Sequence, residues 1–399
     1  MSPDLLRIRT RGARDLLPAE MRAFRRVEDA FRQAALRWGY EEIRTPVIEP
    51  FSLFTVAGAL TPAMLSRVYS FLDWDGWSGE RVVLRPDSTI PVARAVADGG
   101  VKLPARVFYV QNRFRFPADG EAAESWQCGL EHLGAPPAVG DLEVIAVGCE
   151  ALDALGLSPT IRLSHVGVGR ALLAMWHQPG SPEHQELVDL LAEEGLGALS
   201  QRVRGEAVER LLPLLLQPGE RASYVDNLLA LAGEAVPGVR APLEELRAAA
   251  QALEESGRQV VIDLSMPCDF EYYDGLVFEF LVEGEPRGRG GRYRPPIGAC
   301  ETACGLGLDA TELAASLADG DQAPFVAAVV PVTSEDVPRA IGVARALHRS
   351  GLPASLEADG RAAAVAVLVG RDAITLRTPE EERPLRSLDE LVEVLLRFK

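Results

Sequence analysis

The sequence predicts an α+β protein made of a large core domain and a small α/β domain. β-rich runs and amphipathic helical patterns share residues 1–317. A Leu-, Ala- and Glu-rich stretch at about 183–257 interrupts the β-rich runs, which indicates a helical insertion. A polar, glycine-containing linker is expected at 318–324, and alternating strands and helices follow over 325–399.

The composition restricts the partners that the protein can have. The net charge is −17, and lysine occurs only at Lys102 and Lys399, so a basic surface for tRNA or another polyanion is not expected. The sequence contains no run of about 18 uncharged apolar residues, which a membrane-spanning helix would require. The N-terminus lacks the apolar core of a secretory signal. We therefore expect a cytoplasmic protein that binds neither nucleic acid nor membranes.

Five scattered cysteines favour reduced thiols over a disulfide framework. Cys300 and Cys304 are four residues apart, which leaves a metal site as an alternative. Structural zinc requires four converging ligands, however, and no CxxC pair accompanies these two cysteines. The histidines also lack metal-binding spacing. We expect no metal and no cofactor.

The first elements follow from apolar spacing and helix breakers. A helix is expected to begin at Pro18 and to end at Gly39, because apolar residues recur every three or four positions between them. A strand is expected at 40–45, where Pro46 would end it. Residues 69–77 and 81–84 are typical of a strand, a turn and the returning strand.

Asp87 and Thr89 precede a helix that is expected from about Ile90 to Ala97. Residues of these types commonly cap the first turn of a helix and have no further role. The alternative is that they also face a pocket and accept hydrogen bonds from an amino group. The sequence leaves both interpretations open.

The stretch 106–134 predicts a β-hairpin that carries functional groups. Its first strand leads to Arg113 and Arg115, and its second strand brings Gln127 and Glu131 back beside them. A guanidinium, an amide and a carboxylate over one sheet suit a small zwitterion. The alternative is a surface hairpin whose charges are solvated.

The remaining elements of the core alternate between helices and strands. Helices are expected at 141–155 and 169–176, and a buried helical stripe at Leu243, Leu246, Ala250 and Leu253. The β-rich block that follows is expected to contain strands at 259–264 and 271–282, a glycine-arginine turn at 288–293, a strand at 304–308 and a helix through Leu317.

Several of these stretches, in the same order, resemble histidyl-tRNA synthetase, a class II synthetase, over at least residues 11–317. The resemblance implies an antiparallel sheet flanked by helices, a dimer formed through the motif 1 region and a shortened C-terminal domain. The matching stretches are RGARDLLPAE (11–20), GYEEIRTP (39–46, like motif 1), LRPDST (84–89), FRF with WQCGLEHLG (motif 2), EYYDGLVFEF (271–280), GGRY (290–293) and CGLGLDATEL (304–313, in the place of motif 3).

Two departures from this family concern the ATP site. By resemblance, Glu312 stands where motif 3 ends with an arginine that holds the ATP phosphates, and Cys268 replaces a catalytic arginine. A carboxylate about 5 Å from a phosphate costs roughly 3 kcal/mol at an effective dielectric of about 20. A thiol cannot supply the fixed positive charge that stabilises the transition state. ATP activation is therefore not expected.

The amino-acid half of the pocket is largely present, and the resemblance implies a role for each of its residues. Asp87, Thr89 and Gln127 would contact the α-amino group, and Arg115 the carboxylate. Glu131 with Tyr273 would contact the imidazole, and Tyr272 belongs to the same predicted set. Asp87 stands where the family has the longer glutamate. The alternative is a relic pocket that binds nothing.

A synthetase-like core that holds histidine but cannot activate it resembles the regulatory subunit of ATP phosphoribosyltransferase. The resemblance implies a non-catalytic chain that assembles with the short-form catalytic subunit, as a homodimer within a hetero-oligomer. It also implies feedback inhibition of the first step of histidine biosynthesis by L-histidine. Two rivals remain: an active histidyl-tRNA synthetase with atypical ATP ligands, and a class II-like enzyme that acts on another substrate.

Overall fold

The computed structural model describes most of the chain, which divides into two compact units, Met1–Gly320 and Asp321–Lys399. The described residues are 10–55, 62–74, 79–118, 122–175, 177, 180–198, 212–267, 273–295, 297–298, 300–317, 325–360 and 363–398. The expected linker at 318–324, together with Cys268 and Tyr272, therefore lies outside the described residues.

The first unit is built on a nine-stranded sheet whose order is β1-β5-β6-β12-β11-β10-β7-β9-β8. Its central strands pair antiparallel, whereas β1 with β5 and β7 with β9 pair parallel. The strands are β1 (Glu41–Glu42), β5 (Ala105–Phe114), β6 (Glu124–Leu133), β7 (Thr160–His165), β8 (Gly219–Glu220), β9 (Gln259–Ile262), β10 (Tyr273–Val282), β11 (Glu285–Tyr293) and β12 (Ala303–Asp309). The predicted α+β architecture is confirmed.

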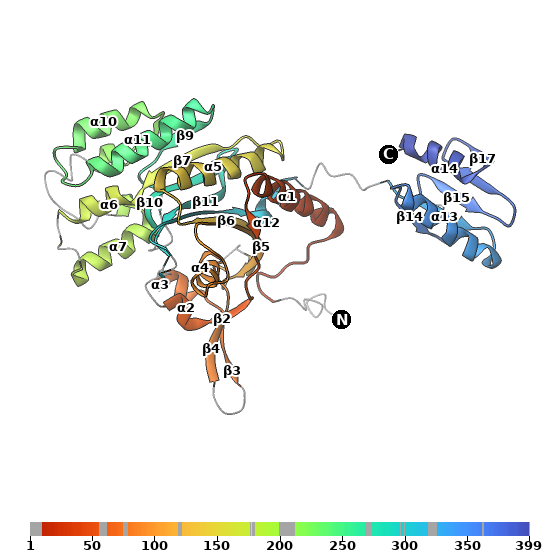
Figure 1. Ribbon diagram of the computed structural model, residues 1–399, viewed down its shortest axis with the longest axis horizontal. Helices are drawn as coiled ribbons and strands as arrows, with labels where there is room; N and C mark the ends of the chain where they lie inside the picture. The colour runs from red at the N-terminus through yellow and green to blue at the C-terminus, as the bar shows by residue number, and fades with distance from the viewer. Residues whose placement is uncertain are drawn as a thin grey trace, which may run out of the picture. The chain divides into compact units, whose positions relative to one another are not determined.

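Three helices cover one face of this sheet, namely α1 (Pro18–Arg37), α5 (Pro137–Asp153) and α12 (Ala310–Leu317) (Figure 1). Their apolar sides and the sheet's apolar side chains form one large buried cluster. Phe31 of α1, for example, packs edge-on against Phe108 of β5, with ring centroids 6.1 Å apart. This core leaves the opposite face of β5, β6 and β12 available for polar groups.

A group of helices follows β7 in the sequence. They are α6 (Val166–Leu173), α7 (Pro182–Glu194), α10 (Ser223–Ala232) and α11 (Arg240–Glu255). The stripe Leu243, Leu246, Ala250 and Leu253 is buried on α11, as the helical spacing predicts.

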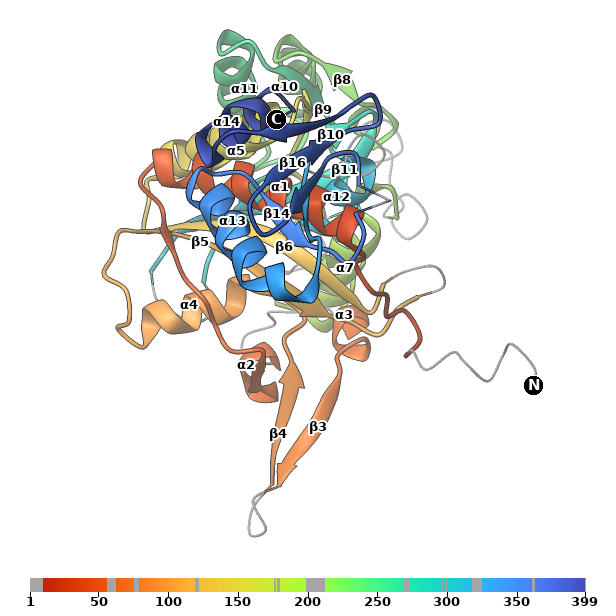
Figure 2. The same cartoon turned by 90° about the vertical axis from the view of Figure 1, so that its right-hand side faces the viewer.

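A smaller three-stranded sheet, in the order β2-β4-β3, precedes the central hairpin. Figure 2 shows β3 and β4 extending away from the large sheet. The elements of this region are β2 (Ile48–Pro50), α2 (Phe51–Thr55), α3 (Pro62–Ser66), β3 (Ser70–Trp74), β4 (Gly79–Leu84) and α4 (Thr89–Ala97).

The second unit is a five-stranded sheet in the order β14-β13-β15-β16-β17, with two helices packed on one face. Strands and helices both occur here, as the sequence pattern predicts, but they do not alternate throughout. Four strands, β14 to β17, follow one another between α13 and α14, and the edge strand β17 was not expected. The elements are β13 (Ala327–Pro331), η3 (Ser334–Asp336), α13 (Val337–Arg349), β14 (Ala354–Leu356), β15 (Ala366–Val369), β16 (Ile374–Arg377), β17 (Glu382–Leu385), α14 (Leu388–Leu395) and η4 (Leu396–Phe398).

The glycine-arginine stretch at 288–293 was expected to form a turn. In the structure it is the main part of strand β11. Its glycines are required by close packing: a Cβ on Gly290 would lie 2.2 Å from the carbonyl oxygen of Gly305 on β12. Glycine in a strand can mark such a close backbone approach as well as a turn. The expectation was wrong because the composition alone does not separate these cases.

The expected strand at 40–45 is reduced to the two residues of β1. After β1, the backbone of Thr45 forms hydrogen bonds with side chains and not with the backbone of a neighbouring strand. The Thr45 N–H donates to Gln111 Oε1 (3.3 Å), and Arg85 Nη1 donates to the Thr45 carbonyl (2.8 Å). The helices expected at 141–155 and 169–176 begin earlier, at Pro137 and Val166. Among the described residues, no helix is both long and apolar enough to cross a membrane.

Candidate functional site

The polar pocket follows from the period-two alternation of β6. Gln127, Gly129 and Glu131 face one side of the sheet, while Cys128 and Leu130 are buried in the core on the other side. On the neighbouring strand β12, glycines lie on the same side as the polar residues, because Glu131 pairs with Gly305 and Gly129 with Gly307.

Those β12 glycines make the space that the polar side chains occupy. A Cβ on Gly305 would lie 1.9 Å from Glu131 Oε2, and one on Gly307 would lie 1.7 Å from Gln127 Nε2. Any larger residue would therefore collide with these side chains. The two glycines let Glu131 and Gln127 lie across the sheet and form the floor of a pocket.

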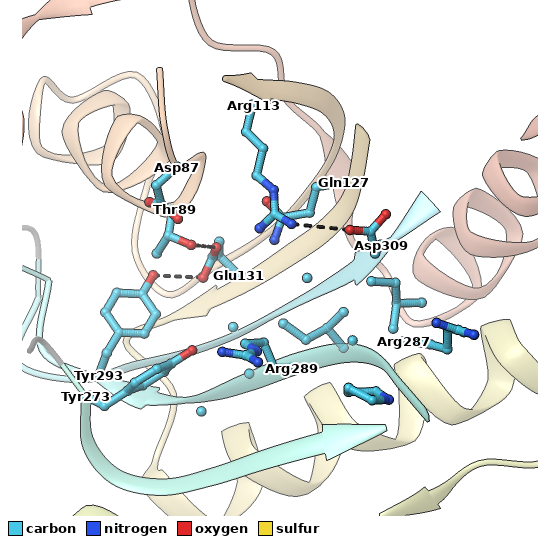
Figure 3. A pocket seen from close by; sticks show the side chains of 18 of the residues that line it. Asp87, Thr89, Arg113, Gln127, Glu131, Tyr273, Arg287, Arg289, Tyr293 and Asp309 are labelled. Atoms are coloured by element: carbon cyan, nitrogen blue, oxygen red, sulfur yellow. Dashed lines mark hydrogen bonds and ion pairs between the residues drawn. The ribbon is translucent and has the colours of Figure 1, made fainter. Parts of the chain in front are cut away.

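Glu131 is fully buried and is held by three hydroxyl groups. Thr89 Oγ1 (2.7 Å) and the Tyr109 hydroxyl (3.3 Å) donate to Oε1, and the Tyr293 hydroxyl (2.9 Å) donates to Oε2. Figure 3 shows the Thr89 and Tyr293 hydroxyl groups directed at Glu131, one at each carboxylate oxygen. Burial raises the pKa of Glu131 to about 8; the charge of Asp87 acts in the same direction, and the hydroxyl bonds act against it.

Asp87 both caps a helix and lines the pocket. Its Oδ1 accepts a hydrogen bond from the Ile90 N–H (3.0 Å) at the start of α4, and the residue is buried. Burial raises the pKa of Asp87, although the charges of Arg115 and Arg113 favour its ionised form. Asp87 therefore caps the helix and faces the pocket, and its contact with an amino group stays a prediction.

The two arginines of the central hairpin are oriented by fixed partners. Arg115 Nε donates to the Pro86 carbonyl (2.9 Å). Arg113 Nε donates to Ser125 Oγ (2.8 Å), and its Nη2 lies 3.3 Å from Asp309 Oδ2. Both guanidinium groups line the pocket beside Gln127, whose Oε1 has no hydrogen-bond partner among the described residues.

These side chains enclose a cavity of about 430 Å³. Its volume is within the range of small-molecule sites. The polar and aromatic side chains that line it are Arg67, Asp87, Thr89, Arg113, Arg115, Gln127, Glu131, Tyr273, Arg287, Arg289, Tyr293 and Asp309.

The cavity gathers most of the residues that the resemblance assigned to histidine binding. Asp87, Thr89, Arg115, Gln127, Glu131 and Tyr273 all line it, although they come from four separate parts of the chain. Tyr272 of that set and Cys268 lie outside the described residues.

Glu312 lies outside this cavity, on α12. It lines an adjacent cavity of about 320 Å³ that shares Arg67, Arg113, Arg115 and Asp309 with the first. Its side chain is 62% exposed, and Oε2 lies 4.0 Å from Arg287 Nη1. Glu312 is thus a peripheral acid near the shared arginines.

Sequence reasoning missed several residues of the cavity, above all Arg287, Arg289 and Tyr293 on β11. Their spacings of two and four residues were the available signal, because even spacings place all three on one face of a strand. Reading 288–293 as a turn concealed it. Tyr109 was likewise treated only as a strand former, although its hydroxyl reaches Glu131.

An antiparallel sheet covered by helices on one face, with a polar pocket on the other, defines a protein of the class II aminoacyl-tRNA synthetase type. A family model described as histidyl-tRNA synthetase matches residues 12–313. The chain belongs to this histidyl-tRNA synthetase family, within the group of ATP phosphoribosyltransferase regulatory subunits.

Individual relatives agree with this placement. The chain is 44% identical over 291 residues to an ATP phosphoribosyltransferase regulatory subunit from Dehalococcoides mccartyi, covering 71% of this chain and 70% of the relative. It is 29% identical to a histidine–tRNA ligase from Methanospirillum hungatei over 392 residues, covering 92% of each. A crystal structure described as an ATP phosphoribosyltransferase regulatory subunit/histidyl-tRNA synthetase from Bacillus halodurans has a TM-score of 0.76. It is 26% identical, and the match covers 90% of this chain and 95% of that one.

Proposed function

We propose that this chain is a non-catalytic regulatory subunit of ATP phosphoribosyltransferase that acts in the cytoplasm with a separate, short-form catalytic subunit. The observation that carries the proposal is the 44% identity to a relative with that name, over 70% of the relative's length. The identity to a histidine–tRNA ligase is lower, at 29%. The assembly is a hetero-oligomer that contains a homodimer of this chain and no tRNA.

The central cavity is the site for free L-histidine in this proposal. A histidine molecule carries one carboxylate, one ammonium group and an imidazole, and the cavity offers a partner for each. Arg115 receives the carboxylate, since a guanidinium binds a carboxylate through two parallel hydrogen bonds. Asp87, Thr89 and Gln127 receive the ammonium group, and Glu131, with the aromatic ring of Tyr273 beside it, receives the imidazole.

Histidine then acts as a feedback inhibitor by binding one arrangement of the complex more tightly than another. A ligand can shift such an equilibrium only by its difference in affinity for the two arrangements. A coupling free energy of about 1 to 3 kcal/mol changes activity some five- to 150-fold, which is enough for feedback control.

Calorimetry tests the pocket. Histidine is titrated into the wild-type protein, into Glu131→Ala and into Glu124→Ala, a matched control at an exposed position of the same strand. We expect binding to the wild type and the control, and at least a tenfold loss in Glu131→Ala. Equal binding to all three proteins would remove Glu131 and this cavity from the proposal.

An activity assay tests the regulatory role. The short-form catalytic subunit is assayed with and without this chain, and then with added histidine. We expect the chain to co-purify with the catalytic subunit and raise its activity, and histidine to suppress it. No stable complex and no change in rate would refute the proposal.

An active histidyl-tRNA synthetase is the second candidate, favoured by the family model that covers residues 12–313. Histidine-dependent exchange between ATP and pyrophosphate separates the two functions. Exchange at a synthetase-like rate would establish that the chain is an active histidyl-tRNA synthetase. We expect no histidine-dependent exchange.

A further inference from the structure

One ion pair lies in the wall that the central and adjacent cavities share. Arg113 comes from β5 and Asp309 from the end of β12, and their side chains meet at 3.3 Å, with Gln127 beside them (Figure 3). Both residues line both cavities. An anionic group that extended from one cavity into the other would therefore pass along this pair.

Asp309 is fixed independently of Arg113. Its Oδ1 accepts hydrogen bonds from the backbone N–H groups of Thr311 (3.1 Å) and Glu312 (3.0 Å), at the start of α12. This leaves Oδ2 directed at Arg113. Because the carboxylate is anchored to the backbone, an incoming anion cannot displace it without breaking the first turn of the helix.

Two further arginines of the central cavity are also paired with acids. Arg289 Nη2 lies 3.1 Å from Glu279 Oε1, and Arg287 Nη1 lies 4.0 Å from Glu312 Oε2. Glu279 is almost completely buried, whereas Glu312 is largely exposed. Much of the positive charge around the cavity is thus compensated before any ligand enters.

We propose that Asp309 is a specificity-determining residue: by neutralising Arg113, it restricts the cavity to ligands that carry a single carboxylate and rejects ligands that carry a phosphate group there. The proposal deepens the assignment of a histidine site and rests on it for the identity of the natural ligand. A phosphate monoester brings up to two negative charges, which the fixed carboxylate repels. A single carboxylate needs only Arg115.

The test compares L-histidine with L-histidinol phosphate, in which a phosphate ester replaces the carboxylate. Both are titrated by calorimetry into the wild type and into Asp309→Asn, which keeps an oxygen to cap α12. We expect the affinity ratio of histidinol phosphate to histidine to rise at least tenfold in the variant. Adding Arg113→Gln to the Asp309→Asn variant should return this affinity ratio to the wild-type value.

Glu301→Gln is the matched control, because it removes the same charge from an exposed position just before β12 that lines neither cavity. We expect it to change the ratio less than twofold. A change of less than tenfold in Asp309→Asn, or an equal change in Glu301→Gln, would overturn the proposal. If Asp309→Asn does not fold, Asp309→Ser, which also keeps a capping oxygen, decides by the same criterion.

Inorganic pyrophosphate separates this inference from the histidine site. Pyrophosphate should bind Asp309→Asn at least tenfold more tightly than the wild type, whether or not either protein binds histidine. Failure of histidine binding alone would refute the proposed ligand, and failure of the pyrophosphate difference alone would refute the role of Asp309.

Discussion

Replacing Glu131 with glutamine should change how the stability of the protein depends on pH. The pKa of Glu131 is raised to about 8 because the carboxyl group is fully buried. The folded state therefore holds a proton that the unfolded chain releases near its ordinary pKa of 4.5. For an acid with a raised pKa, the free energy of unfolding is highest at low pH. It falls as pH rises between the two pKa values.

The size of this effect follows from the two pKa values. Each pKa unit corresponds to about 1.4 kcal/mol, so the contribution of Glu131 to the free energy of unfolding falls by about 4 kcal/mol between pH 5 and pH 9. Glutamine does not titrate. Its amide can still accept from Thr89 and Tyr109, but it presents an N–H₂ group to the Tyr293 hydroxyl, which adds a cost of about 1 to 3 kcal/mol that is independent of pH.

The assay is urea denaturation of wild type and Glu131→Gln at pH 5, 7 and 9, without ligand. We expect the variant to be less stable at pH 5, and its stability relative to wild type to improve steadily as pH rises. Titrating groups that do not interact with Glu131 are common to both proteins and cancel in the difference. Asp87 does not cancel, because its charge contributes to the raised pKa of Glu131 in the wild type, and its effect is part of the measured difference. A difference in the free energy of unfolding that stays constant across the three pH values would refute the reasoning.

Three further substitutions test the site and its support. Gly305→Ala should weaken histidine binding at least tenfold in calorimetry, because its Cβ would lie 1.9 Å from Glu131 Oε2; unchanged affinity would contradict this geometry. Arg292→Met should lower the free energy of unfolding by about 3 to 5 kcal/mol in urea titrations, because it leaves the buried Asp141, 2.7 Å from Arg292 Nη2, without its main partner. Leu246→Ala should cost about 2 to 5 kcal/mol by the same measurement, since Leu246 is fully buried; a cost below 1 kcal/mol would mean that the α11 stripe is not part of the core.

The parts of the fold that were predictable are those fixed by local periodicity. The spacing of three and four residues in α11 predicts the stripe that is buried there, and the period of two in β6 places Gln127 and Glu131 on one face. Such patterns report which side of an element meets the core. The buried side of an element can therefore be predicted from its own sequence, without knowing which other element packs against it.

The rest of the site depends on contacts between distant parts of the chain. Arg113 and Asp309 are 196 residues apart, and nothing local to either predicts their pairing. Strand β11 was hidden for a related reason: its glycines resemble a turn until β12, which packs against them, is known. Local patterns therefore located the polar strands but not the pairs that balance their charge.

Two of the three acids that line the pocket, Glu131 and Asp309, differ in how they are held, and under the proposed function this difference favours a zwitterionic ligand. Glu131 is buried with a raised pKa, so at neutral pH it is mostly protonated until a cationic group beside it favours the carboxylate. Asp309 is already held by Arg113 and by two backbone N–H groups. A lone cation would gain from Glu131 but would leave Arg115 without a ligand anion, and a highly charged anion would be repelled by Asp309. A ligand with one ammonium or imidazolium group and one carboxylate satisfies Glu131 and Arg115 together, and it leaves the Arg113–Asp309 pair intact.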